Sequence, residues 1–130
     1  MTRTLLIVSA AIEVATGLAL LASPPLVVSL LLGGSLDTPA ALAVARVTGA
    51  ALLSLGVACW LARNDARSRA AVGLVAAMLL YNAAAVAILG YAWFSLGLSA
   101  PGLWPAILLH VALAVWCIAC VSKSTRSIKQ

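Results

Sequence analysis

Four long apolar stretches are the feature that most constrains the fold of this 130-residue chain. They cover residues 4–22, 40–62, 70–92 and 102–122. Each has about 20 residues, the length that an α-helix needs to cross a hydrocarbon layer about 30 Å thick. Only 8% of the residues are charged, whereas soluble domains contain about 25%. We therefore predict an all-α integral membrane protein, a single four-helix transmembrane bundle over residues 1–130.

Helix is the favoured state for these stretches. Backbone polar groups in lipid must find partners within the protein, which leaves helices or closed β-barrels. Ala and Leu dominate the stretches, and the apolar–polar alternation of barrel strands is absent. The net charge of +5 does not indicate nucleic-acid binding, because the basic residues form no stripe interleaved with aromatic side chains. The expected partner is therefore the lipid bilayer and not nucleic acid.

The connections between the spans are short. Pro24 and Pro25 end the first span, because proline lacks a backbone donor and restricts the residue before it. The apolar segment 25–33 is too short to cross a bilayer, and we expect a short interfacial helix or a re-entrant turn there. Asp37 or Thr38 is placed to cap the second span. The chain is therefore expected to contain no soluble domain and no long linker.

The basic residues predict the orientation of the bundle. Seven of the eight lie before the first span, between the second and third, or after the fourth. They are Arg3, Arg63, Arg67, Arg69, Lys123, Arg126 and Lys129. By the positive-inside rule this side faces the cytoplasm. We therefore expect a multi-pass protein of the bacterial inner (plasma) membrane with both termini cytoplasmic.

The first span also has features of a secretory signal peptide. Arg3 and the apolar run after it fit such a peptide, and cleavage would leave three spans. However, Glu13 lies in the middle of the run, and no clear small-x-small cleavage site precedes Pro24. We therefore expect the first span to be retained.

Each span carries one strongly polar residue: Glu13, Arg46, Asn82 and His110. Counted from the outer ends at about 1.5 Å per residue, all four lie roughly 9–15 Å deep, in one layer. A charge at the bilayer centre costs about 2.5–3.5 kcal/mol on insertion scales, so these side chains are expected to face one another. Glu13 and Arg46 are the natural ion pair, with Asn82 and His110 as further hydrogen-bonding groups. Tyr81 is expected to line this layer or to hydrogen-bond to the backbone.

Two interpretations of the polar layer are open. In the first it is a ligand-binding or proton-linked site, in which Arg46 attracts an anionic or carbonyl-bearing ligand and Glu13 and His110 exchange protons. In the second it is a buried network that specifies helix pairing and binds nothing. Gly17 shares a helical stripe with Glu13, and Gly49 shares one with Arg46, so close helix approach is expected. Haem ligation by His110 would need a second copy of the chain, which has one histidine.

The three cysteines form a candidate thiol cluster near the cytoplasmic ends of their spans. Cys59, Cys117 and Cys120 would suit a soft metal or a dithiol redox pair. Two points favour packing instead: the dipole at a helix C-terminus disfavours a thiolate, and the cytoplasm is reducing. We therefore predict no metal site and keep the thiol cluster as the alternative.

Two segments carry a resemblance to a known family. The run RVTGAALLSLG, residues 46–56, and the segment PPLVVSLLLG, residues 24–33, resemble small bacterial four-helix membrane proteins of the DoxX-like type. The similarity covers most of the chain in layout. That family includes subunits linked to quinone-dependent oxidation, so the resemblance implies quinone association. No catalytic signature matches, and no catalytic residue is carried over.

No motif of a soluble enzyme is present, because the chain has no Gly-rich phosphate loop, no nucleophile elbow and no zinc-protease helix. We predict a non-enzymatic membrane protein, an accessory or ligand-binding subunit with no predicted cofactor. The alternatives are a small-molecule or proton-coupled transporter and a quinone- or thiol-linked redox subunit. A homo-oligomer or a larger membrane complex is compatible with so small a bundle.

Overall fold

The computed structural model describes residues 1–128, with side chains up to Lys123, and this part is all-helical as predicted. Its helices are α1 (Thr2–Ala22), α2 (Pro24–Leu32), α3 (Pro39–Ala62), α4 (Arg69–Leu96) and α5 (Leu103–Ile128). By length and composition, α1, α3, α4 and the Leu103–Lys123 part of α5 are able to cross a membrane. Of the basic residues expected on the cytoplasmic side, the Arg126 side chain and Lys129 lie outside what the structure describes.

The helix ends follow from capping residues. The side chains of Thr38 and Ser68 accept hydrogen bonds of 3.1 Å from the amides of Ala41 and Ala71, which satisfies free donors in the first turns of α3 and α4. α4 continues beyond the expected end at residue 92, because it is Gly97, with a left-handed φ of 65°, that terminates the helix.

α1 and α3 make the most extensive helix contact in the described chain. Gly17 and Gly49 are buried where the two backbones meet. A Cβ added to Gly17 would lie 2.7 Å from the carbonyl O of Gly49 and 2.7 Å from the amide N of Leu53. One added to Gly56 would lie 2.8 Å from Cγ2 of Val14. Small residues permit this close approach, as is common between membrane helices.

The hydrophobic core joins all four long helices at only one end of the bundle, which we call the closed end. The shared core there consists of Leu5, Leu6, Ala10, Cys59, Val75, Met78, Leu113, Cys117 and Cys120. Beyond it the core divides into two branches. One branch holds α1 against α3 through Leu20, Ala45 and Leu52. The other holds α4 against α5 through Leu89, Leu103 and Ile107. α3 and α4 consequently touch each other little, and we call the place of division the fork.

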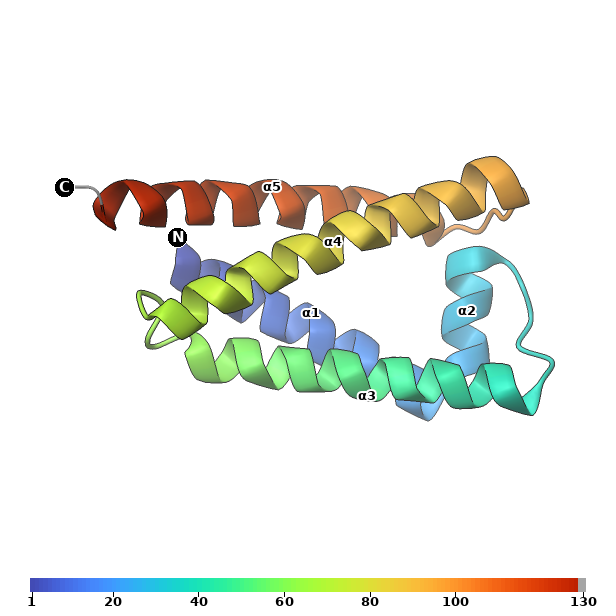
Figure 1. Cartoon of the computed structure of the whole chain (residues 1–130). Helices are drawn as coiled ribbons and strands as arrows, with labels where there is room; N and C mark the ends of the chain where they lie inside the picture. Colours follow the sequence, from blue (N-terminus) through green and yellow to red (C-terminus); the bar gives the residue numbers. More distant parts are fainter. Residues whose placement is uncertain (129–130) are drawn as a thin grey trace.

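α2 lies crosswise at the open end of the fork (Figure 1). Its Val27 packs against the α1–α3 branch, and Leu31 and Leu32 pack against the α4–α5 branch. The amide of Gly102 donates a hydrogen bond of 3.0 Å to the carbonyl O of Leu30. The segment expected as an interfacial helix or a re-entrant turn is therefore a helix, and it ties the two branches together.

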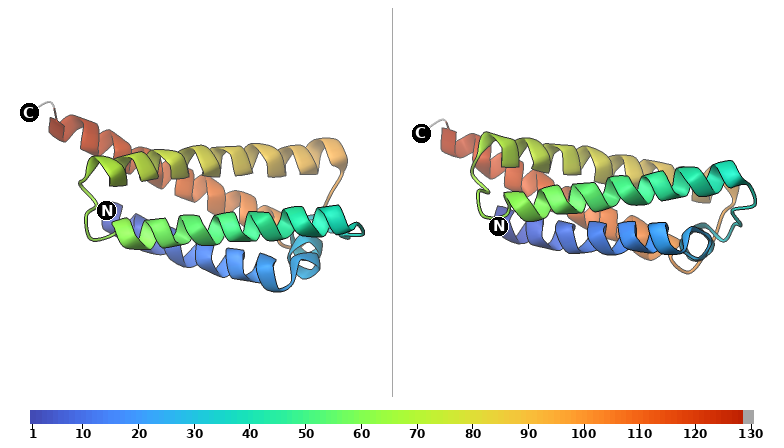
Figure 2. Two further views of the ribbon diagram at one scale, coloured as in Figure 1. Left: turned by 60° about the horizontal axis from the view of Figure 1, so that its bottom comes forward. Right: turned by 90° about the horizontal axis from the view of Figure 1, so that it is seen from below.

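The two ends of the described chain lie at the closed end of the bundle. Figures 1 and 2 show the N-terminus, the α3–α4 connection and the C-terminal end of α5 there, opposite α2. These segments carry Arg3, Arg63, Arg67, Arg69 and Lys123, whereas the α2–α3 and α4–α5 connections contain no Lys or Arg. The charge asymmetry read along the sequence is therefore also an asymmetry between the two ends of the molecule.

Candidate ligand-binding site

An open groove runs along α3 on the side that faces α4, where Tyr81 of α4 borders it; we call it the α3–α4 groove. Its volume is about 500 Å³, within the range of small-molecule sites, roughly 300–1,000 Å³. It is lined by Ala43, Val44, Val47, Thr48, Ala51, Leu52, Leu55 and Tyr81. The hydroxyl of Thr48 donates to its own helix, at the carbonyl O of Val44 over 2.9 Å. The groove is therefore apolar, with Tyr81 as the polar residue that is free to act in it.

Tyr81 stands where the groove meets the fork. Its side chain packs against the shared core and against the α1–α3 branch. Its ring is edge-on to the imidazole of His110, with 5.6 Å between the centroids and 83° between the planes. On α1, Glu13 lies between Ala10 and Val14, and both of these residues approach Gly56 of α3. Glu13 is therefore level with the neighbouring groove residue Leu55. Tyr81 thus connects the groove with His110, and Glu13 lies at the level of the groove.

Asn82 and His110 form a hydrogen-bonded pair beside Tyr81. Nδ2 of the buried Asn82 donates to the carbonyl O of Met78 over 2.7 Å, and its Oδ1 lies 2.8 Å from Nδ1 of His110. The Met78 oxygen can only accept, so it determines which way the Asn82 amide points. Since Oδ1 also only accepts, Nδ1 of His110 carries the hydrogen, and Nε2 of the neutral ring is an acceptor.

We expect nitrogen NMR of histidine-labelled protein in lipid bilayers to show hydrogen on Nδ1 of His110 and none on Nε2. The chain has one histidine, so the signals need no assignment. Asn82→Ala removes the acceptor and should lower the free energy of unfolding by about 1 kcal/mol, as for other hydrogen bonds between membrane helices. Hydrogen on Nε2 alone in the wild-type protein would show that the pair is not formed as described.

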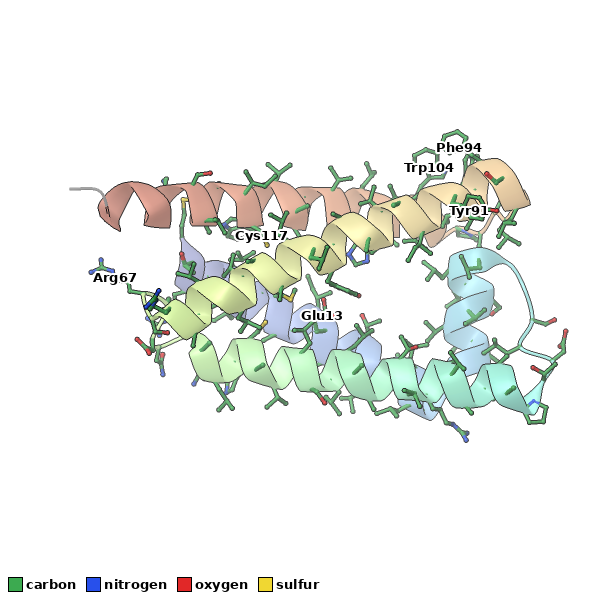
Figure 3. The ribbon with its side chains drawn as sticks, viewed as in Figure 1. Glu13, Arg67, Tyr91, Phe94, Trp104 and Cys117 are labelled. Atoms are coloured by element: carbon green, nitrogen blue, oxygen red, sulfur yellow. The ribbon has the colours of Figure 1, made fainter. Side chains whose placement is uncertain are left out.

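Glu13 is buried without a partner. Its side chain is 1% exposed, and neither its Oε1 nor the Oγ of Ser9, one turn earlier on α1, has a hydrogen-bond partner in the described part of the protein. Figure 3 shows Glu13 at mid-bundle, on the part of α1 that is seen between α3 and α4. An unpaired buried polar atom costs about 1–3 kcal/mol, so such atoms are few in native proteins. These two mark a place that can accept the polar group of a ligand.

Arg46 does not belong to this cluster. It is exposed on α3, and among the described side chains no ion pair joins it to Glu13. The expected Glu13–Arg46 ion pair is therefore wrong. The physical reason is helical phase: α3 turns Ala45, Gly49 and Leu52 toward α1, and Arg46 lies one residue after Ala45, about 100° around the helix.

The three thiols lie in the shared core and not in the polar cluster. Cys59, Cys117 and Cys120 are free and buried among apolar side chains of the four long helices. In the described chain no group of three His, Cys, Asp or Glu side chains could hold a metal ion. Packing as small apolar side chains accounts for their positions.

Two parts of the site were not expected from the sequence. Ser9 was not among the candidate site residues, although its position one turn from Glu13 was an available signal. The groove was not expected because it depends on the separation of α3 from α4. The separation of α3 from α4 depends on the tertiary arrangement of the helices, and no pattern in the sequence of α3 indicates it.

The fold and the site define a small helical bundle that combines four helices able to cross a membrane with a buried polar cluster beside an open apolar groove. Comparison of the chain with models of protein families, with curated proteins and with solved structures gave no match. The residues of the site are therefore the basis for assigning a function.

Proposed function

We propose that this is a membrane-embedded binding protein that takes up a lipophilic small molecule from the bilayer. The apolar body of the ligand would occupy the α3–α4 groove, and its polar end would reach Glu13 past Tyr81. The observation that carries the proposal is the unpaired, buried Glu13 carboxyl at the level of a groove of ligand size. A bound ligand would supply the hydrogen-bond partner that Oε1 of Glu13 lacks among the described side chains.

The proposed location is the bacterial inner membrane, with the closed end of the bundle in the cytoplasm. The basic residues at that end follow the positive-inside rule. Aromatic residues near both ends are typical of membrane interfaces: the Arg63 guanidinium lies 3.7 Å from the Trp60 ring centroid, and the Trp93 and Trp104 centroids are 5.4 Å apart. Figure 3 shows Arg67 and Trp104 toward opposite ends of the bundle. The groove would then open in the outer half of the bilayer.

Mass spectrometry of co-purifying molecules tests the proposal. The wild-type protein should retain a lipophilic molecule, and Ala51→Phe should retain at least about tenfold less, because the ring fills the groove and ΔG of binding falls by more than about 1.4 kcal/mol. Ala51 is exposed, so the change disturbs no core packing.

Ala87→Phe is the matched control for the groove-filling variant. Ala87 is also exposed, but it lies on α4 outside the groove, so retention should be as in the wild-type protein. Equal retention by both variants and the wild type would contradict binding in the groove.

Two narrower proposals concern the ligand and its movement. The resemblance to DoxX-like proteins suggests a quinone, which the same mass spectra would identify. Proton-coupled transport is a second candidate, supported by the buried carboxyl of Glu13 and by the imidazole of His110 beside Tyr81. Uptake into proteoliposomes that requires a pH gradient would distinguish transport from binding alone.

A further inference from the structure

Because Arg46 is exposed, the charge expected of a ligand at the buried polar cluster differs from the charge predicted from the sequence. An inward-facing arginine would favour an anionic or carbonyl-bearing ligand. Instead, Glu13 is the only Asp, Glu, Lys or Arg side chain that is buried among those the structure describes. An ionised carboxylate in such surroundings is strongly unfavourable unless a positive charge pairs with it. The site therefore favours a cation, or a proton, over an anion.

The free hydrogen-bonding atoms of the cluster indicate the same chemistry. Nε2 of neutral His110 is an acceptor, and so is Oε1 of ionised Glu13. The hydroxyls of Ser9 and Tyr81 can accept as well as donate a hydrogen bond, so they are compatible with either kind of group. An ammonium group offers three donors and no acceptor, so it is complementary to the two acceptors, Oε1 of Glu13 and Nε2 of His110.

We propose that the ligand is a lipophilic primary amine bound as its monovalent ammonium ion. This inference rests on the proposed function and specifies the polar end of its ligand. The ammonium head pairs with the Glu13 carboxylate and the hydrocarbon body lies in the groove at the level of Glu13, where Tyr81 lines the groove. Glu13 accounts for the charge selectivity, and the apolar lining accounts for the lipophilic body.

Binding exchanges the ammonium ion for a proton. The O–H bond of the neutral Glu13 carboxyl breaks and its proton passes to water. The N–H groups of the ammonium then donate to the carboxylate oxygens in its place, so the charge of the site is unchanged. No electron is transferred.

The other titratable groups near Glu13 come from three helices. Cys59 of α3 and Cys117 of α5 lie together in the shared core, and Tyr81 of α4 packs against that core. His110 of α5 contacts Tyr81. These groups are mainly uncharged at neutral pH, so the charge that a ligand meets is that of Glu13.

Three probes of eight carbons each separate charge from lipophilicity: octylammonium, octanol and octanoate. Their binding to the full chain in nanodiscs of zwitterionic lipid is measured by titration calorimetry against empty nanodiscs. We expect octylammonium to bind at least about tenfold more tightly than the other two. It should also release up to one proton per molecule bound in weakly buffered solution, because the protonated fraction of a single carboxyl loses its proton on exchange.

Glu13→Gln should remove the preference for octylammonium, because it keeps the shape of the side chain and removes the charge. Asp65→Asn makes the same chemical change at an exposed acid in the α3–α4 connection and should leave the preference intact. Octylammonium binding without proton release by the wild-type protein overturns the exchange, even if Glu13→Gln fails to fold.

The remaining outcomes separate this inference from the proposed function. If octanol or octanoate binds as tightly as octylammonium and Ala51→Phe blocks all three, the ammonium inference is overturned and the groove function stands. If none of the probes binds, or if Ala51→Phe leaves binding unchanged, the inference and the groove function both fail.

Discussion

Gly17→Ala should lower the free energy of unfolding by about 3 kcal/mol, the upper part of the usual range for overpacked contacts. The new Cβ would lie 2.7 Å from the carbonyl O of Gly49 and 2.7 Å from the amide N of Leu53. Both are backbone atoms, which cannot rotate away as the end of a side chain does. α1 and α3 must therefore separate, and the core branch that holds them together loses contacts. Unfolding of the purified protein in mixed micelles by titration with a denaturing detergent measures the loss.

Gly90→Ala provides the matched control within the same bundle. No heavy atom lies within 4 Å of a Cβ built on Gly90. Since alanine exceeds glycine in helix propensity by about 1 kcal/mol, this variant should be as stable as the wild type or slightly more so. Similar losses in the two variants would mean that α1 and α3 do not approach each other as closely as described.

Arg46→Leu should favour membrane insertion by up to about 3 kcal/mol, because leucine replaces an exposed arginine within a helix that is able to span a membrane. Arg46 lies roughly 10 Å along α3 from Pro39, so the full value for the bilayer centre is an upper bound. Breaking a buried Glu13–Arg46 ion pair would have the opposite sign, a loss of about 3–5 kcal/mol. The sign of the free-energy change caused by Arg46→Leu therefore distinguishes an exposed arginine from one that is paired with Glu13.

A double-mutant cycle of Glu13→Leu and Arg46→Leu provides the control for this prediction. The coupling energy should be close to zero, because the two side chains share no contact among the described residues. Apparent insertion free energies and unfolding in micelles give the four values of the cycle. A coupling of several kcal/mol would restore the ion pair and remove the argument for a cationic ligand.

The helical architecture could be predicted from the sequence because the length of a span and the position of a helix end depend on residues that are close together in the chain. Long apolar runs mark the spans, Pro24 separates α1 from α2, and Thr38 caps α3. α4 ends later than hydropathy suggests, because its stop is the left-handed conformation of Gly97. The pairing of α1 with α3 and of α4 with α5 depends on packing in three dimensions, and the division of the core at the fork follows from that pairing.

The candidate site could be predicted in part for the same reason. Counting residues along each span gives depth, and the structure brings Tyr81, Asn82 and His110 together, with Glu13 buried in the bundle interior. Depth does not give helical phase, however. Arg46 was assigned to the stripe of small residues that faces α1, but that face of α3 is occupied by its neighbour Ala45 and excludes Arg46.

The central claim is that the Glu13 carboxyl binds the polar end of a ligand held in the α3–α4 groove. The chain contains a single glutamate, so labelling the side-chain carboxyl carbon of glutamate reports on Glu13 alone. Solid-state NMR of this protein in bilayers, with octylammonium labelled at its nitrogen, measures the dipolar coupling between the two labels. The account predicts a dipolar coupling as large as expected for two groups in direct contact, and it predicts that Ala51→Phe abolishes this coupling. The absence of a coupling at ligand concentrations that saturate binding would contradict the account.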